Sequence, residues 1–96
     1  MQGLITKKLS SSGSITTKPC IIHSMLLGTD GVNDPTITVY HGTDNTGTEV
    51  IPTNTYDGSR KDLNGFSNIP IDCPDGAYFE LSGSGTHEVI FYLKYT

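Results

Sequence analysis

The residues that could do chemistry are three histidines and two cysteines, scattered along a chain of 96 residues. Ser24 follows His23 directly, but consecutive residues of a strand point to opposite faces, so this pair is not placed to act together. Nucleophilic catalysis needs a histidine beside a nucleophile, and no GxSxG, HExxH or P-loop motif supplies such a site. We therefore expect no catalytic residues and no enzyme. The five residues are Cys20, His23, His41, Cys73 and His87.

The cysteines and the acidic loops could hold a metal ion, but their spacing argues against it. Zinc sites need a CxxC or comparable spacing, which this chain lacks. Two free, partly buried thiols are the favoured interpretation, and a disulfide closing a loop of about 50 residues is the alternative. Asp30, Asn33 and Asp34 offer oxygen ligands, yet the EF-hand glutamate is missing and Asx-rich loops are usually turns. We expect no metal and no cofactor, with calcium at this loop left open.

The composition indicates one all-β domain over residues 1–96, with residues 1–14 as a flexible or edge-strand N-terminal segment. One alanine and three glutamates stand against thirteen threonines and nine isoleucines, so helix formers are scarce and β-branched residues are common. The net charge is −4 with six basic residues, which disfavours nucleic-acid binding. The chain contains no apolar run of the roughly 20 residues that a membrane span needs.

Short alternating runs separated by turn residues predict a small antiparallel β-sandwich or jelly roll of seven to eight strands. Residues 54–65 are expected to form a surface loop with one helical turn, or a poor strand. Pro52 places its strand at an edge or a bulge. The predicted strands span residues 2–9, 15–18, 20–28, 36–41, 49–53, 66–73, 77–82 and 87–95.

The last two strands are the most apolar part of the chain. Because a glycine-containing loop separates residues 77–82 from residues 87–95, we expect an antiparallel hairpin whose Phe79 and Phe91 face the core. The run 20–28 is apolar on both alternating faces, so it is buried on both sides or held in an interface on one. Strict alternation puts Ile21, His23, Met25 and Leu27 on one face and Cys20, Ile22, Ser24 and Leu26 on the other.

Three tyrosines and an isoleucine fall on the faces that should point outward. Several such side chains on adjacent strands would form a patch, and patches of this kind suggest a protein–protein interface. Two alternatives stay open: the loop 54–65 covers this face, or the tyrosines stack against sugars, although the chain has no tryptophan. The candidate interface residues are Tyr40, Tyr78, Ile90 and Tyr92.

Two stretches resemble small virion proteins of tailed bacteriophages. They read GTDGVNDPTITVYHGTDNTGTEV and IPIDCPDGAYFELSGSGTHEVIFYLKY, and the resemblance covers about residues 20–95. Members of that family look like β-sandwich or jelly-roll building blocks of capsids and tails. The resemblance offers no catalytic residues to carry over.

The role that this resemblance implies is that of a capsid decoration, or cement, protein. Such a protein would be a homotrimer bound to the major capsid protein or other virion proteins, located on the capsid surface after synthesis in the host cytoplasm. The alternatives are another virion subunit, such as a head–tail connector, tail or fibre-base protein, or a carbohydrate-binding module or adhesin.

Overall fold

The computed structural model describes residues 3–59 and 64–96, and within these residues it contains eight strands and no helix. The predicted all-β class is confirmed, and most strand bounds lie within two residues of the predicted ones. The described residues include no helix with the length and apolar character to cross a membrane. The strands are β1 (Ile5–Leu9), β2 (Gly13–Thr16), β3 (Cys20–Gly28), β4 (Thr36–His41), β5 (Glu49–Thr55), β6 (Asn64–Cys73), β7 (Ala77–Ser82) and β8 (Glu88–Tyr95).

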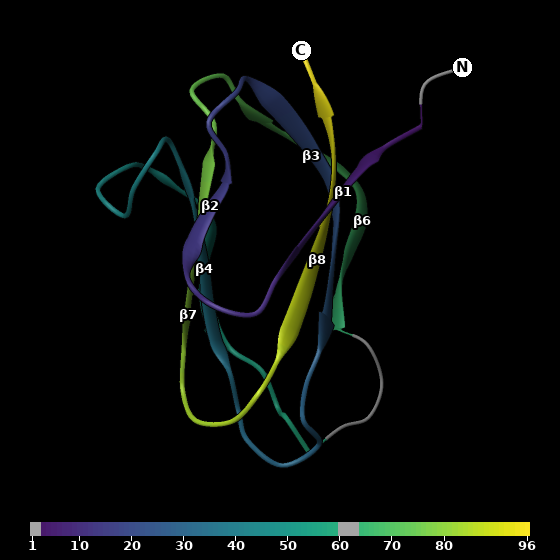
Figure 1. The fold of residues 1–96 in the computed structure, drawn as a ribbon, viewed down its shortest axis with the longest axis vertical. Coiled ribbons are helices and arrows are strands. Elements are labelled where there is room, and N and C mark those ends of the chain that lie inside the picture. Colours follow the sequence, from purple (N-terminus) through teal and green to yellow (C-terminus); the bar gives the residue numbers. More distant parts are fainter. Residues whose placement is uncertain (1–2, 60–63) are drawn as a thin grey trace.

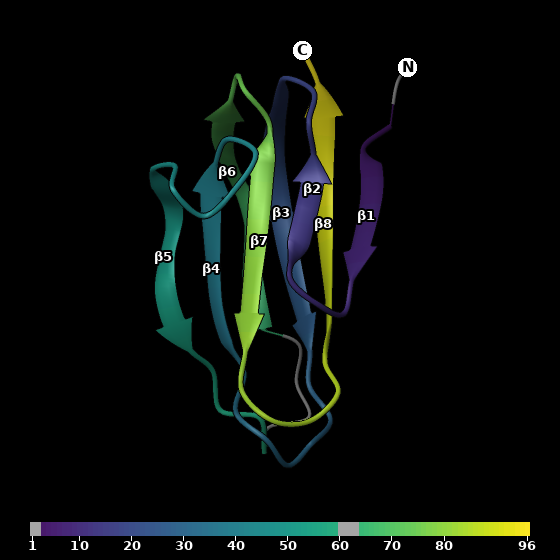
Figure 2. The same ribbon diagram turned by 60° about the vertical axis from the view of Figure 1, so that its left-hand side comes forward.

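The strands form two four-stranded antiparallel sheets that pack face to face as a sandwich (Figures 1 and 2). We call β1-β8-β3-β6 the first sheet and β2-β7-β4-β5 the second sheet. The pairs β1–β8, β2–β7, β3–β6 and β4–β5 are those of an antiparallel ribbon folded upon itself. This pairing is the eight-stranded jelly roll.

The predicted hairpin between β7 and β8 is wrong. β7 pairs with β2 and β4 in the second sheet, whereas β8 pairs with β1 and β3 in the first sheet. The loop between β7 and β8 therefore crosses from one sheet to the other, with Gly83 and Gly85 at positive φ. Phe79 and Phe91 still meet, but across the sandwich, with ring centroids 5.5 Å apart and ring planes at 70°. Edge-to-face contacts of this kind stabilise beyond the area they bury.

The core lies between the sheets and is built from alternate residues of the strands. Ile37 and Val39 are fully buried, as their alternation in β4 predicts. Thr38 points to the opposite face yet is only 3% exposed, and its hydroxyl is 2.7 Å from that of Thr53 on β5. The buried apolar residues are Ile15, Cys20, Ile22, Met25, Leu27, Ile37, Val39, Cys73, Ala77, Phe79, Val89, Phe91 and Leu93.

The predicted faces of β3 are wrong, because the strand contains a bulge. Its register against β8 runs Ile22↔Leu93 and then Ser24↔Tyr92, so β3 contains one extra residue, His23, between these two pairs. A bulge of this kind reverses the alternation. Cys20 and Ile22 before it face the core, as do Met25 and Leu27 after it, and all four are fully buried.

The sheet edges on one side are β5 and β6, each of which contains a proline. Pro52 lies on β5, where the register against β4 is irregular, so the predicted edge or bulge position is confirmed. Of the segment 54–65, residues 54–55 continue β5, whereas residues 60–63 lie outside the described part of the chain. The expected helical turn or poor strand there is therefore only partly covered by the structure.

Candidate functional site

The four predicted interface residues point outward and are half-buried, but they do not form one patch. Tyr40 and Tyr78 lie on the outer face of the second sheet, whereas Ile90 and Tyr92 lie on the outer face of the first sheet. The core separates the two pairs. The expectation of one patch on adjacent strands is therefore wrong, because β7 and β8 belong to different sheets.

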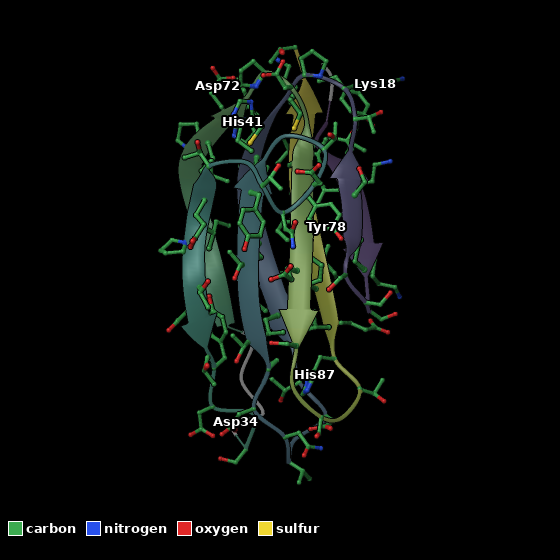
Figure 3. The ribbon with its side chains drawn as sticks, turned by 90° about the vertical axis from the view of Figure 1, so that its left-hand side faces the viewer. Lys18, Asp34, His41, Asp72, Tyr78 and His87 are labelled. Atoms are coloured by element: carbon green, nitrogen blue, oxygen red, sulfur yellow. The ribbon has the colours of Figure 1, made fainter. Side chains whose placement is uncertain are left out.

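The first surface, which we call the tyrosine surface, is formed by Tyr40, Tyr78, Glu80, Glu49 and Asn45. Tyr40 and Tyr78 are directly opposite each other on β4 and β7. The β4–β5 connection, residues 42–48, rises from this face beside Tyr78 (Figures 1 and 3), and Asn45 Nδ2 donates to Glu80 Oε2 at 3.2 Å. The two tyrosines are therefore bordered by hydrogen-bonding side chains.

The charge of the tyrosine surface is negative. Desolvation raises the pKa of the Tyr40 hydroxyl above its usual value, and the carboxylates of Glu80 and Glu49 raise it further. Glu49 Oε1 also accepts a hydrogen bond from the Thr53 backbone N–H at 3.1 Å. A partner of this surface must therefore offer donors or positive charge in addition to a flat apolar face.

The second surface, which we call the aliphatic surface, is formed by Leu26, Ile90 and Tyr92, with Lys8 at its margin. Ile90 lies between Lys8 on β1 and Leu26 on β3, and Tyr92 is opposite Ser24. Lys8 Nζ is 3.5 Å from Glu88 Oε2, an exposed pair that contributes little stability. Strict alternation placed Leu26 on the same face as Ile22, so Leu26 was not predicted as an interface residue. The run 20–28 is apolar on both faces, and this was the sign that one of its apolar side chains would point outward.

The Asp30 loop is held together by its own hydrogen bonds. Asp30 Oδ1 accepts from the backbone N–H groups of Val32 and Asn33 at 2.9 and 2.8 Å. Oδ2 accepts from Asn33 Nδ2 at 2.8 Å and from Thr86 N at 3.3 Å, which ties the β3–β4 loop to the β7–β8 loop. A Cβ at Gly85 would collide with the Asp30 carboxylate. The four hydrogen bonds fix the position of the Asp30 carboxylate between the two loops.

The remaining acidic member of this loop is also engaged. Asp34 Oδ1 accepts from the Gly58 backbone N–H at 2.8 Å and so connects the loop to the segment after β5. Among the described residues no cluster of three or more His, Cys, Asp or Glu side chains has metal-binding geometry. Both carboxylates join this loop to neighbouring segments of the chain.

The three histidines lie at separate places in the sandwich and have different surroundings. Figure 3 shows His41 and His87 at opposite ends of the sandwich. His41 Nε2 lies 3.1 Å from the Asp75 backbone nitrogen and 3.2 Å from its Oδ2. His87 precedes β8, is 2% exposed, and donates from Nε2 to the Ser84 carbonyl at 3.0 Å. His23 lies at the bulge of β3 and is half-buried.

The two cysteines, by contrast, are brought together. Cys20 at the start of β3 and Cys73 at the end of β6 are direct partners in the register of the first sheet. Both are free thiols with no exposed surface. The favoured interpretation was two free, partly buried thiols, and both are in fact fully buried. The alternative, a disulfide, required the two cysteines to lie side by side, as they do.

The chain was compared with protein-family models, with curated proteins and with solved structures. None of the three comparisons found a match.

Proposed function

We propose that the protein is a structural component of a tailed-bacteriophage virion, a trimeric decoration protein that binds the outer capsid surface and stabilises the head. The observation that carries the proposal is the jelly-roll pairing of the eight strands, in a chain whose loops and last strands resemble phage virion proteins. The jelly roll occurs in viral capsid domains and also in lectins. Fold alone does not define function, so the two surfaces must support the assignment.

The aliphatic surface suits contacts between subunits. Obligate interfaces are more apolar than transient ones, and Leu26, Ile90 and Tyr92 form the more apolar of the two outward clusters. A chain of 96 residues has a small core and gains stability when it oligomerises. In the proposal this surface holds the trimer together.

The tyrosine surface suits attachment to the capsid. Its aromatic pair is bordered by Glu80 and Asn45, which matches the mixed apolar and polar character of a non-obligate interface. A trimer would present three copies of the surface at once. Attachment could then be tight through avidity even where each single contact is weak.

The test is a matched pair of variants, Tyr92→Asp on the aliphatic surface and Tyr78→Asp on the tyrosine surface. Light scattering at micromolar concentration should give about three times 10.3 kDa for the wild-type chain. Tyr92→Asp should give a monomer with an unchanged circular dichroism spectrum, because a buried unpaired charge opposes association. Tyr78→Asp should remain trimeric but fail to sediment with phage heads stripped of decoration protein.

Two results would contradict the proposal. A wild-type chain that is monomeric and does not bind stripped heads would remove the decoration role. A Tyr92→Asp chain that stays trimeric would show that the aliphatic surface is not the subunit contact. Localisation of a labelled chain to the tail or connector would favour the other virion roles.

A second candidate, a carbohydrate-binding module or adhesin, is favoured by the tyrosine surface. Two adjacent aromatic side chains, Tyr40 and Tyr78, can stack on sugar rings while Asn45 and Glu80 bond to hydroxyl groups. A bacterial glycan array should then show binding that Tyr78→Ala abolishes and Tyr92→Ala retains. An array without any signal, together with binding to stripped heads, would exclude the carbohydrate-binding role and favour the decoration role.

A further inference from the structure

We propose that Cys20 and Cys73 are a latent cross-strand disulfide site that small disulfides such as oxidised glutathione convert into a covalent link between β3 and β6. The inference is independent of the proposed function. It rests on the register and the burial of the two cysteines.

The positions of the two cysteines satisfy the geometry of a disulfide. They are direct partners across two antiparallel strands, where Cα atoms lie about 4.5 or 5.5 Å apart. Disulfides span Cα separations of roughly 4.4–6.8 Å. Directly paired residues project their side chains to the same face of the sheet, and both cysteines are fully buried there, so the two side chains lie next to each other. A bond between them needs little movement of the backbone.

Both thiols lie at the end of the first sheet, where local opening would be easiest. Pro19 precedes Cys20 and Pro74 follows Cys73, and both prolines are exposed. Both strands leave the sheet at this point, and β6 is an edge strand. Fraying of this corner would admit an oxidant to thiols that have no exposed surface in the closed structure.

The exchange proceeds in two balanced steps. One cysteine, as its thiolate, attacks a sulfur of oxidised glutathione, which breaks that disulfide, forms a mixed disulfide and releases one glutathione thiolate. The second cysteine thiolate then attacks the protein sulfur of the mixed disulfide and releases the second glutathione. The two thiol protons pass to the two glutathione thiolates. Two protein thiols are oxidised and one molecule of oxidised glutathione is reduced.

The environment makes this reaction slow at neutral pH. Burial raises the pKa of both thiols, that of Cys73 to about 12, and the thiolate is the reacting species. The rate of oxidation of the folded protein should therefore rise as the pH is raised towards 9. Once formed, the disulfide would join an edge strand to an interior strand and close a loop of about 50 residues.

The experiment is oxidation of the folded wild-type chain by excess oxidised glutathione at about pH 7 and pH 9. We expect the intact mass to fall by about 2 Da, faster at the higher pH, with no thiol titratable in denaturant afterwards. The oxidised chain should remain a 10.3 kDa species on a non-reducing gel. Its midpoint of thermal unfolding should rise by about 10 °C, and a reductant should reverse the rise.

Cys73→Ser is the matched control, because it keeps one thiol and removes its partner. It should show neither the mass loss nor the increase in thermal midpoint. The proposal is overturned if the wild-type chain keeps two titratable thiols, if it accumulates only mixed disulfides with glutathione, or if its only disulfides join two chains. The wild-type mass and thiol count decide the matter even where the serine variant does not fold.

Discussion

At the scale of single residues, the Asp30 carboxylate holds two loops together by accepting four hydrogen bonds. Hydrogen bonds from the Asn33 side chain and backbone, and then from the Val32 backbone, hold its pKa well below the ordinary value of 3.8. The unfolded chain therefore takes up the proton first as the pH falls. The contribution of this carboxylate to stability is complete above pH 3.8 and is lost as the pH falls through the lower folded pKa.

We predict that Asp30→Asn lowers the midpoint of thermal unfolding at pH 7, because an amide nitrogen cannot accept from Thr86 N or from Asn33 Nδ2. The gap between the midpoints of wild type and variant should narrow as the pH falls from 3.8 towards about 2.5, because the Asp30 carboxylate of the unfolded wild-type chain takes up a proton in this range while that of the folded chain stays ionised. Thermal unfolding followed by circular dichroism at both pH values measures this. Asp44→Asn is the control at pH 7: Asp44 accepts hydrogen bonds from Thr46 within its own turn, so its replacement should lower the midpoint less than the replacement of Asp30, which joins two loops. A gap that stays constant with pH would refute the assignment.

At the scale of elements, the bulge of β3 decides which side chains reach the core. One extra residue near His23 allows Ile22 and Met25, three positions apart, to face the same way. We predict that deletion of both His23 and Ser24 abolishes cooperative unfolding, because Met25 would then follow Ile22 directly, and Met25 and Leu27 would be turned out of the core. His23→Ser retains the extra residue and should unfold cooperatively, within about 1 kcal/mol of the wild-type free energy. A deletion variant with native stability would mean that the strand repairs its register elsewhere.

The same elements show what the sequence could predict. Alternation located β4 and β7 at their observed bounds, because a strand with one buried face repeats every second residue, and a continuous apolar run located β3. Alternation also gave the outward direction of Tyr40, Tyr78, Ile90 and Tyr92. It could not assign β7 and β8 to sheets, since a five-residue glycine loop serves equally in a hairpin or in a crossing between sheets. The outward direction of each candidate interface residue was therefore predicted, but the grouping of the four residues into one patch was wrong.

At the scale of the whole molecule, the jelly roll is assembled almost entirely from strands distant in sequence. In the described chain, only β4 and β5 are both consecutive and paired. The first and last strands of the chain, β1 and β8, pair with Ile5 opposite Leu93, which brings the two ends of the chain to the same end of the sandwich (Figure 1). Pairing over such separations carries a large entropy cost of closing the intervening loop, so folding should be slow for a domain of this size.

This arrangement predicts the behaviour of a circular permutant. A short Gly-Ser linker from Thr96 to Gly3, with new ends between Ser10 and Ser11, turns β8 and β1 into a local hairpin. The new ends fall in an exposed bend, so the permutant should keep the all-β spectrum and a thermal midpoint within about 5 °C of the parent. It should refold faster than the parent in stopped-flow tyrosine fluorescence, because the β1–β8 pairing no longer closes a loop of most of the chain.

The matched control opens the same joined chain between Ser24 and Met25, inside β3, and should not fold because it cuts a strand that pairs on both sides. Slower refolding of the first permutant, or folding of the second, would mean that the β1–β8 pairing does not limit the assembly of this sandwich.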